Sequence, residues 1–536
     1  MLYKKILGKD AVKVHFLETK KILEVLPKNF EKLSAIAFEE MRYFFSIKHL
    51  ENWKTILDSS ESSDSEKEKM ERNIRAAVEA KNKRVPYCQD CGTDTAYIFR
   101  GDQTIVSSDI FREIQTGASE ARQKNPFRNS VFVPKEDVLE KNSGDNSPCE
   151  VHFFDHLIDG EIAGIFSNKG GGSGSKLWNF SEKPSLYQDR DNLVDYLCKK
   201  IAEMGHSACP PYHLKIVLGG LSHLQNSQFL TLATVENYVW AKNPDLEVVR
   251  DKAMEEAILK RLKISNMGAQ GEGKFFLMPD GLRIFRAPRH AAHFFIGMGV
   301  SCSAHRIQRF KINEDGVFLE ELCKNPEQFL EKQKLLAVKK KQKEINLDDD
   351  LEIVLKVLRQ IKSGEEFFVS GKILGARDKA HARWLQNFEK KGVIPDYLRQ
   401  YLSVFYVGPS DTPKGEIIGS FGPTTASRMD EFSEFLGQQS VLPLSIAKGT
   451  RSKMFARNCK KYGMMFVAIQ GGPASLLRNF VKSQKVIDFE DLGMEAVRLY
   501  EVERMPVQMI VDAKGNDFYQ ELADDFFSPL FVHGIE

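Results

Sequence analysis

Hydrophobic residues in the first 80 positions recur mainly at the spacing of a helix. Over residues 35–45, apolar side chains return every three or four positions, which predicts an amphipathic helix with one buried face. Residues 67–81 are rich in charge and predict an exposed helix, and the polar run at 58–65 predicts a loop before it. We therefore expect the first 80 residues to be mostly helical.

From residue 88 onward, short apolar runs are separated by loops rich in glycine and proline. Residues 95–99 and 214–218 predict strands, whereas residues 246–262 have the spacing of an amphipathic helix. Strands that alternate with helices are typical of a mixed α/β protein.

A reversal of charge between residues 339 and 350 predicts a domain boundary. A basic run begins at Lys339 and an acidic run ends at Asp350, a pattern typical of a solvated linker. Beyond it, residues 352–358 predict a helix, and residues 367–375 and 464–469 predict strands. We expect a large N-terminal α+β domain (1–338), a linker (339–352) and a smaller C-terminal α/β domain (353–536); a chain of 536 residues is too long for one core.

Composition excludes several classes of protein. Hydrophobic residues make up 42%, charged residues 28%, and the net charge is +2, so neither a nucleic-acid partner nor a basic membrane patch is indicated. No apolar run approaches the roughly 20 residues of a membrane span, and the first ten residues lack the apolar core of a signal peptide. The 8 cysteines are too sparse for a disulfide framework, which favours reduced thiols and a cytoplasmic location.

Three cysteines, Cys88, Cys209 and Cys302, lie in stretches that favour loops. Iron–sulfur clusters are held by cysteine thiolates, normally four for a cubane, and a cluster with three would leave one iron open as a Lewis acid. Cys91 forms a Cys-x-x-Cys pair with Cys88, but no second pair completes a zinc site. The remaining cysteines are expected to be small buried apolar residues: Cys149, Cys198, Cys323 and Cys459.

The glycine-rich stretch from Lys169 to Lys176 could present backbone N–H groups to an anion. It does not match a nucleotide-binding motif, and a flexible loop is an equally good interpretation.

Basic residues in Gly- or Pro-punctuated loops indicate a small polyanion such as a dicarboxylate. Among them are His290, Arg377 and Lys448. Gly-Pro-Thr at 422–424 predicts a helix start, which would place Thr424 and Arg428 on one helical face.

These motifs together resemble class I, iron–sulfur-dependent fumarate hydratase, in order from about residue 85 to residue 520. The segments that carry the resemblance include Cys-Gln-Asp-Cys-Gly-Thr at 88–93, Lys-Gly-Gly-Gly-Ser at 169–173, Ala-Cys-Pro-Pro-Tyr-His at 208–213, Pro-Arg-His at 288–290, Gly-Met-Gly-Val-Ser-Cys-Ser-Ala at 297–304, Gly-Ala-Arg-Asp at 375–378, Gly-Pro-Thr-Thr-Ala at 422–426, Ala-Lys-Gly at 447–449, Leu-Gly-Met-Glu-Ala at 492–496 and Asp-Ala-Lys-Gly-Asn-Asp-Phe at 512–518.

The resemblance implies a function and a set of site residues. It implies reversible hydration of fumarate to L-malate with a [4Fe-4S] cluster on Cys88, Cys209 and Cys302, Thr424 as base and Asp90 as acid. It also implies a swivelling-type C-terminal domain, a homodimer, and this substrate-binding set: Gln89, Arg128, Gly171, Gly172, His290, Arg377, Arg428 and Lys448.

Some alternatives stay open. The family usually has threonine where this chain has Cys91, so Cys91 could be inert, capture iron from a damaged cluster, or act as the fourth ligand of an electron carrier. A related hydro-lyase acting on tartrate or mesaconate would use the same chemistry, whereas the near-neutral charge disfavours an iron-sensing, RNA-binding protein. Because neutral threonine is a poor base, we hypothesise that Arg428 or another cation lowers the pKa of Thr424. With the cysteines before the linker and Thr424 after it, the site should form between the domains.

Overall fold

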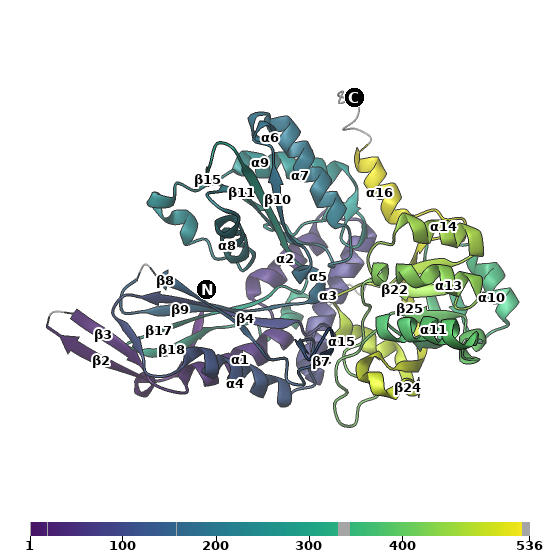
Figure 1. Ribbon diagram of the computed structural model, residues 1–536, viewed down its shortest axis with the longest axis horizontal. Helices are drawn as coiled ribbons and strands as arrows, with labels where there is room; N and C mark the ends of the chain where they lie inside the picture. The colour runs from purple at the N-terminus through teal and green to yellow at the C-terminus, as the bar shows by residue number, and fades with distance from the viewer. Residues whose placement is uncertain (1, 19, 157, 331–342, 528–536) are drawn as a thin grey trace.

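The computed structural model describes residues 2–18, 20–156, 158–330 and 343–527, and its fold is mixed α/β (Figure 1). We call residues 2–330 the N-terminal part and residues 343–527 the C-terminal part. In Figure 1 the N-terminal part runs from purple to teal on the left, and the C-terminal part runs from green to yellow on the right.

A six-stranded sheet forms one layer of the N-terminal part. Its order is β1 (Tyr3–Leu7), β18 (Gly316–Glu320), β17 (Arg306–Asn313), β9 (Ile162–Lys169), β4 (Thr93–Gly101) and β8 (Glu150–His156). Helix α1 (Asn29–Tyr43) packs on one face together with α4 (Ile110–Gln123). The other face contributes Tyr97, Phe99 and Ile165 to a core shared with α8 (His223–Thr234). Burial on both faces explains why the centre of β4, residues 96–99, is a continuous apolar run.

A second, five-stranded sheet carries the segments that lead into two of the predicted cysteine ligands. Its order is β10 (Leu177–Glu182), β16 (Phe294–Ser301), β11 (His213–Gly220), β15 (Arg283–Arg289) and β12 (Val249–Arg250). Cys302 follows the last residue of β16, and Cys209 lies four residues before β11. Helices α7 (Arg190–Met204) and α9 (Lys252–Ile264) pack together beside this sheet.

Seven strands form the sheet of the C-terminal part, in the order β19 (Glu344–Asn346), β20 (Glu366–Gly375), β21 (Ser403–Phe405), β22 (Leu444–Ala447), β23 (Met465–Ala468), β25 (Val497–Val511) and β24 (Val481–Asp488). Strands β20 to β23 are parallel neighbours, and β25 also pairs with β20, which closes the sheet on itself. Helices α11 (Asp378–Lys391), α13 (Ser433–Gln438) and α14 (Lys453–Tyr462) lie around it. The carboxyl ends of four parallel strands therefore share one edge.

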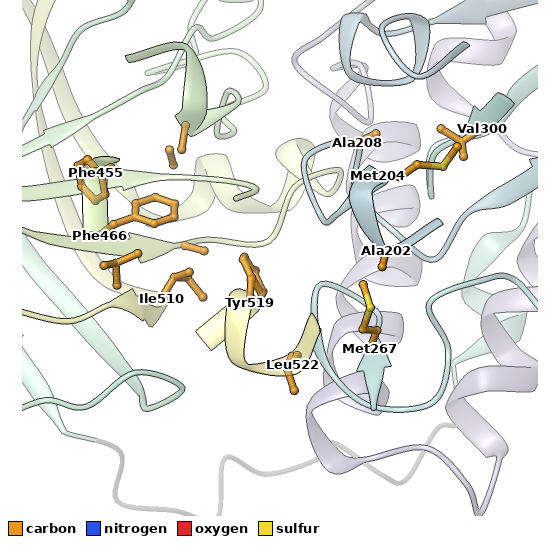
Figure 2. Close-up of a cluster of buried hydrophobic side chains, with 14 of the residues drawn as sticks. Ala202, Met204, Ala208, Met267, Val300, Phe455, Phe466, Ile510, Tyr519 and Leu522 are labelled. Carbon is orange, nitrogen blue, oxygen red and sulfur yellow. The ribbon is translucent and has the colours of Figure 1, made fainter. Parts of the chain in front are cut away.

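Apolar contacts join the two parts. Helix α16 (Phe518–Phe527) belongs to the C-terminal part, and Figure 2 shows its Tyr519 and Leu522 facing Ala202 and Met267 of the N-terminal part. Helix α3 (Asp64–Lys83), which packs on α2 (Ile47–Asp58), also contacts α15 (Ala474–Leu477). The interface thus combines a shared core with helix packing.

Most predicted elements are confirmed, including the helices at 35–45, 67–81 and 352–358, the last of which is α10 (Leu351–Leu358). Strands occupy all the segments for which strands were predicted. The helix predicted at 246–262 begins only at Lys252, because Val249 and Arg250 pair with β15.

The prediction of mostly helical structure in the first 80 residues is wrong for the first 25. These residues form β1, β2 (Val12–Leu17) and β3 (Lys20–Val25), and β3 pairs with β5 (Thr104–Val106). Val12, Val14 and Phe16 alternate with polar residues, a period of two that favours a strand.

The predicted linker falls partly outside the described residues, namely at 339–342. Its later residues include β19, which pairs with β20. Among the described helices, none is both long and apolar enough to cross a membrane.

Candidate active site

A cavity of about 850 Å³ lies between the two parts. The N-terminal part lines it with residues from the segments 89–93, 128–132 and 169–176, and the C-terminal part with residues from 377–379, 423–428 and 494–495. The position between the parts agrees with the prediction from sequence. The predicted site residues that the structure brings together here are Gln89, Asp90, Arg128, Gly171, Gly172, Arg377, Thr424, Arg428 and Lys448.

His290 is the predicted substrate ligand that does not line this cavity. It is exposed in the loop after β15, where its ring stacks on that of His293 with centroids 5.3 Å apart. The structure therefore does not bring His290 together with the other candidates.

Asp90 lies in the loop that leads into β4, and its carboxylate has several polar partners. Its carboxylate accepts a hydrogen bond from the backbone N–H of Gly171 at 2.8 Å and pairs with Arg128 at 3.2 Å. A Cβ on Gly170 would lie 2.9 Å from this carboxylate, which explains the need for glycine there. Burial alone would raise the pKa of Asp90, but Arg128, Arg306 and Lys448 lower it to about 2. The resting carboxyl is therefore ionised at neutral pH, and Asp90 must first take up a proton before it can act as an acid.

Two predicted substrate ligands also bridge the parts. Nε2 of Gln89 donates to the carbonyl of Pro423 at 2.8 Å, and a guanidinium N–H of Arg128 donates to the carbonyl of Gly408 at 3.0 Å. Behind them the buried Arg122 donates to the carbonyl of Arg128 at 2.7 Å. The loop that carries Arg128 is thus fixed from within the N-terminal part as well.

Arg377 is buried at the end of β20, yet its guanidinium is weakly paired. Its nearest carboxylate oxygens, on Asp378 and Glu495, are both 3.7 Å away, and its Nε has no hydrogen-bond partner. Those distances are too long for good hydrogen bonds. Burial lowers the pKa of Arg377 to about 10, so it stays charged at neutral pH. It is the side chain best prepared to receive an incoming carboxylate. Arg428, by contrast, is 45% exposed and pairs with Asp378 at 3.5 Å.

Thr424 and Arg428 both line the cavity, but the helix predicted to begin at Gly-Pro-Thr is wrong. The 3₁₀ segment η5 (Ala426–Phe432) begins two residues after Thr424. The backbone N–H of Thr424 instead donates to the carbonyl of Tyr406 at 2.8 Å, so this residue pairs in an extended segment. The Thr424 hydroxyl donates to the same carbonyl at 2.9 Å, which leaves its lone pairs free.

The ammonium group of Lys448 contacts one predicted cysteine ligand and interacts electrostatically with the other two. Nζ of Lys448 donates to the sulfur of Cys209 at 2.9 Å. Burial would lower the pKa of Lys448, but Cys209, Cys88 and Cys302 raise it through the negative charge that each carries when ionised. Burial raises the pKa of the Cys88 thiol to about 12, so metal binding must release a proton from this thiol.

The donor set suits iron and sulfide better than a lone ion. Among the described residues, no group of three His, Cys, Asp or Glu is arranged to hold a single metal ion. An iron–sulfur cluster is several atoms across and is bound mainly through cysteine thiolates. Gly471 also lies against Cys209, where any Cβ would overlap the sulfur. The residues therefore fit a cluster with three cysteine ligands.

Cys91 belongs to a different environment from Cys88. It is fully buried in the core beneath the six-stranded sheet, and its sulfur accepts a hydrogen bond from the backbone N–H of Arg128 at 3.3 Å. Gly92 next to it has φ +63 and leads straight into β4, so no helix follows the Cys-x-x-Cys pair. This placement favours the inert interpretation of Cys91. The other cysteines predicted to be core residues are buried: Cys149, Cys198, Cys323 and Cys459.

Sequence reasoning missed two contributors to the site. Arg306, at the start of β17, donates to the backbone carbonyl of Asp90 at 2.9 Å; its position four residues after Cys302 was the available signal. Glu495 lies near Arg377 and accepts the backbone N–H of Lys379 at 3.2 Å. It belongs to the Leu-Gly-Met-Glu-Ala segment at 492–496, which carried the family resemblance but was assigned no site residue.

Comparison with known proteins agrees with this geometry. A family model described as "Fumarate hydratase (Fumerase)" matches residues 31–311, and one described as "Fumarase C-terminus" matches residues 316–522. "Fumarate hydratase 1, mitochondrial" of Leishmania major is 37% identical over 510 residues, 94% of this chain and 91% of that protein. "Fumarate hydratase class I, aerobic" of Escherichia coli strain K12 is 31% identical over 522 residues, 96% of this chain and 94% of that protein.

Two more distant relatives each match only one part of this chain. Both are proteins of Methanocaldococcus jannaschii named as subunits of an L(+)-tartrate dehydratase. The α subunit is 28% identical over 47% of this chain and 88% of its own length. The β subunit is 29% identical over 33% of this chain and 92% of its own length. Both halves of this chain are thus accounted for by one group of hydro-lyases, and the chain belongs to the class I fumarate hydratase family.

Proposed function

We propose that this chain interconverts fumarate and L-malate with a [4Fe-4S] cluster held by Cys88, Cys209 and Cys302. The observation that carries the proposal is the cavity between the two parts, where cationic and carboxylate side chains meet Lys448, whose ammonium group contacts the Cys209 sulfur. Family membership supports the reaction type, a reversible hydration.

When bound, such a cluster with one open iron supplies a Lewis acid for the malate hydroxyl and its neighbouring carboxylate. The buried guanidinium of Arg377 would bind the remote carboxylate, with Gln89, Arg128, Arg428 and backbone N–H groups of Gly171 or Gly172 completing the substrate contacts. Lys448 adds positive charge beside the carboxylate, where charge develops as the C–H proton leaves.

Proton transfer would involve Thr424 and Asp90. The Thr424 hydroxyl donates to the Tyr406 carbonyl, which fixes its oxygen at the cavity. This oxygen can accept the C–H proton once its own proton has passed to solvent. A cation in the cavity must lower the pKa of this hydroxyl for it to act as a base, and Arg428 lines the same cavity. Asp90 starts ionised, so it takes up a proton from solvent and then gives it to the departing hydroxyl, which leaves as water. His290 stays a predicted substrate ligand.

Substrate preference separates this proposal from its nearest alternative, a tartrate or mesaconate hydro-lyase. In the tartrate dehydratase matches the two halves are separate proteins, whereas this chain joins both, as the fumarate hydratases do. That arrangement favours fumarate. An electron-transfer role needs a fourth ligand, and the core position of Cys91 argues against one.

We further propose the division into a cluster-binding domain (1–338), a linker (339–352) and a swivelling-type domain (353–536), together with a homodimer and a cytoplasmic location. The closed sheet of the C-terminal part supports a separate second domain. These proposals rest on the resemblance and on composition.

The test is anaerobic purification, reconstitution of the cluster, and measurement of fumarate formation from L-malate by ultraviolet absorbance, with tartrate and mesaconate in parallel. Strong malate turnover that is lost in air supports the proposal. Preference for another diacid would replace the substrate but keep the chemistry, and no turnover with an intact cluster would refute the function.

A further inference from the structure

Gln270 joins the two parts beside Cys209. It is the second turn residue between the short strands β13 (Met267–Gly268) and β14 (Gly271–Glu272), with φ +58. The ammonium of Lys69, from α3, donates to its backbone carbonyl at 3.0 Å, and Gln270 is 7% exposed. The turn therefore presents the Gln270 side chain from a fixed backbone.

The amide of Gln270 pairs with the backbone of Gly471 in both directions. The N–H of Gly471 donates to Oε1 of Gln270 at 2.7 Å, and Nε2 donates to the carbonyls of Gly471 at 3.0 Å and Pro210 at 3.1 Å. Pro210 follows Cys209 directly, and Gly471 lies in the loop after β23. One side chain thus ties the segment that bears Cys209 to the C-terminal part.

Gly471 packs against the Cys209 sulfur. A Cβ at this position would overlap that sulfur and would come within 2.7 Å of Cδ of Lys448. Cys209 itself is only 4% exposed. The backbone of Gly471 therefore covers the thiol on the side of the C-terminal part.

We propose that Gln270 is a positioning residue that holds Gly471 over the Cys209 thiol and limits the access of solvent and reagents to this sulfur. The effect of Gln270 on the thiol depends only on contacts within the chain. A longer life of a cluster bound to Cys209 would be a second effect of Gln270, and it rests on the proposed function.

A second contact between the parts provides a matched control. The hydroxyl of Ser475 donates to the carbonyl of Ala76 at 2.6 Å, is fully buried, and also joins the C-terminal part to α3. Among the described residues, no cysteine is a hydrogen-bond partner of the Ser475 hydroxyl. If Gln270 acted only by strengthening the interface, loss of the Ser475 bond would have the same consequence.

The first experiment uses the full-length, cluster-free chain under reducing conditions. Iodoacetamide labelling at timed intervals, followed by peptide mass spectrometry, gives separate rates for Cys88, Cys209 and Cys302. Gln270→Leu removes both Gly471 hydrogen bonds. We therefore expect Cys209 to be labelled about tenfold faster, which corresponds to about 1.4 kcal/mol less free energy to expose the thiol. The rates at Cys88 and Cys302 should stay within about twofold of those in the original chain. Gln270→Glu keeps the bond from the Gly471 N–H and should give an intermediate rate. Ser475→Ala should leave Cys209 unchanged.

An unchanged Cys209 rate in Gln270→Leu, or an equal rise at all three cysteines in both Gln270→Leu and Ser475→Ala, would overturn the proposal. Circular dichroism identifies a misfolded Gln270→Leu protein, in which case Gln270→Glu decides. With the reconstituted chain, the cluster absorbance of the Gln270 variants should decay faster in air than that of Ser475→Ala. A chain that binds no cluster at all would refute the proposed function, while the labelling result would still decide the role of Gln270.

Discussion

The pairing of Arg377 predicts a large effect of the substitution Arg377→Lys on substrate binding. The buried guanidinium has no partner at Nε, and its carboxylate neighbours are 3.7 Å away, so two N–H groups are available to one substrate carboxylate. Lysine keeps the charge but loses one of the two bonds. A hydrogen bond to a charged group contributes about 1.5–3 kcal/mol, which corresponds to a rise in KM of roughly 10- to 150-fold. Because this carboxylate is held in both ground state and transition state, kcat should change much less than KM.

Arg428→Lys is the matched control. Arg428 lines the same cavity but is 45% exposed and pairs with Asp378, so we expect a loss of about 0.2–1 kcal/mol and a rise in KM of about 1.5- to 5-fold. Initial rates of fumarate formation from L-malate, measured anaerobically on proteins with equal cluster absorbance, give both constants. A larger rise in KM for Arg428→Lys than for Arg377→Lys would show that burial and free N–H groups do not identify the carboxylate ligand.

Three further predictions follow from single contacts. Thr424→Ala should lower kcat by at least about 100-fold with the cluster absorbance retained, because it removes the hydroxyl held on Tyr406; near-normal kcat would exclude Thr424 from proton transfer. Cys91→Thr should keep both cluster and activity, since a threonine oxygen can also accept the Arg128 N–H; loss of the cluster absorbance would instead indicate a fourth ligand. Burial raises the pKa of Asp517 to about 6, so its stabilising contribution is complete below about pH 4 and is lost as the pH rises through 6. Asp517→Asn keeps the acceptor for the N–H groups of Tyr519 and Gln520. It should raise the free energy of unfolding at pH 7 by at most about 2–3 kcal/mol, because the group is partly exposed, and should raise the thermal midpoint at pH 7 but not at pH 4. An equal shift of the midpoint at both pH values would contradict this.

The sequence identified loops whose residues the structure brings to one cavity, but it misread the first 25 residues and the turn at Pro423. Glycine and proline around Cys88, Cys209 and Cys302 marked loops, and loops can bring residues distant in sequence to one place. The contact between Gln270 and Gly471 could not be predicted in this way, because it joins two uncharged residues 201 positions apart. No local pattern of polarity identifies such a pair.

Two errors have a common physical origin. Pro423 was expected to open a helix, but Pro423 pairs with Val407 in an isolated antiparallel bridge, and the N–H of the next residue, Thr424, donates to the carbonyl of Tyr406. Likewise, the strands in the first 25 residues are stabilised by pairing with β18 and β5, which lie far along the chain. In both places pairing with a distant segment produces extended structure, and over residues 12–16 the local period of two already favoured it.

The parallel order of β20, β21, β22 and β23 explains why Arg377, Thr424 and Lys448 meet in one cavity and why Gly471 lies beside Lys448. Arg377 follows β20, Lys448 follows β22 and Gly471 follows β23, while Thr424 bonds to Tyr406, the residue after β21. The carboxyl ends of parallel strands lie at one edge of a sheet, where α/β proteins commonly bind ligands. Each loop could be recognised from its own residues, but their convergence depends on a strand order that no single loop encodes. Substitutions within three residues after these strand ends should therefore affect binding or the cysteine thiols, whereas substitutions in α14, or in α11 beyond Lys379, should act through stability alone.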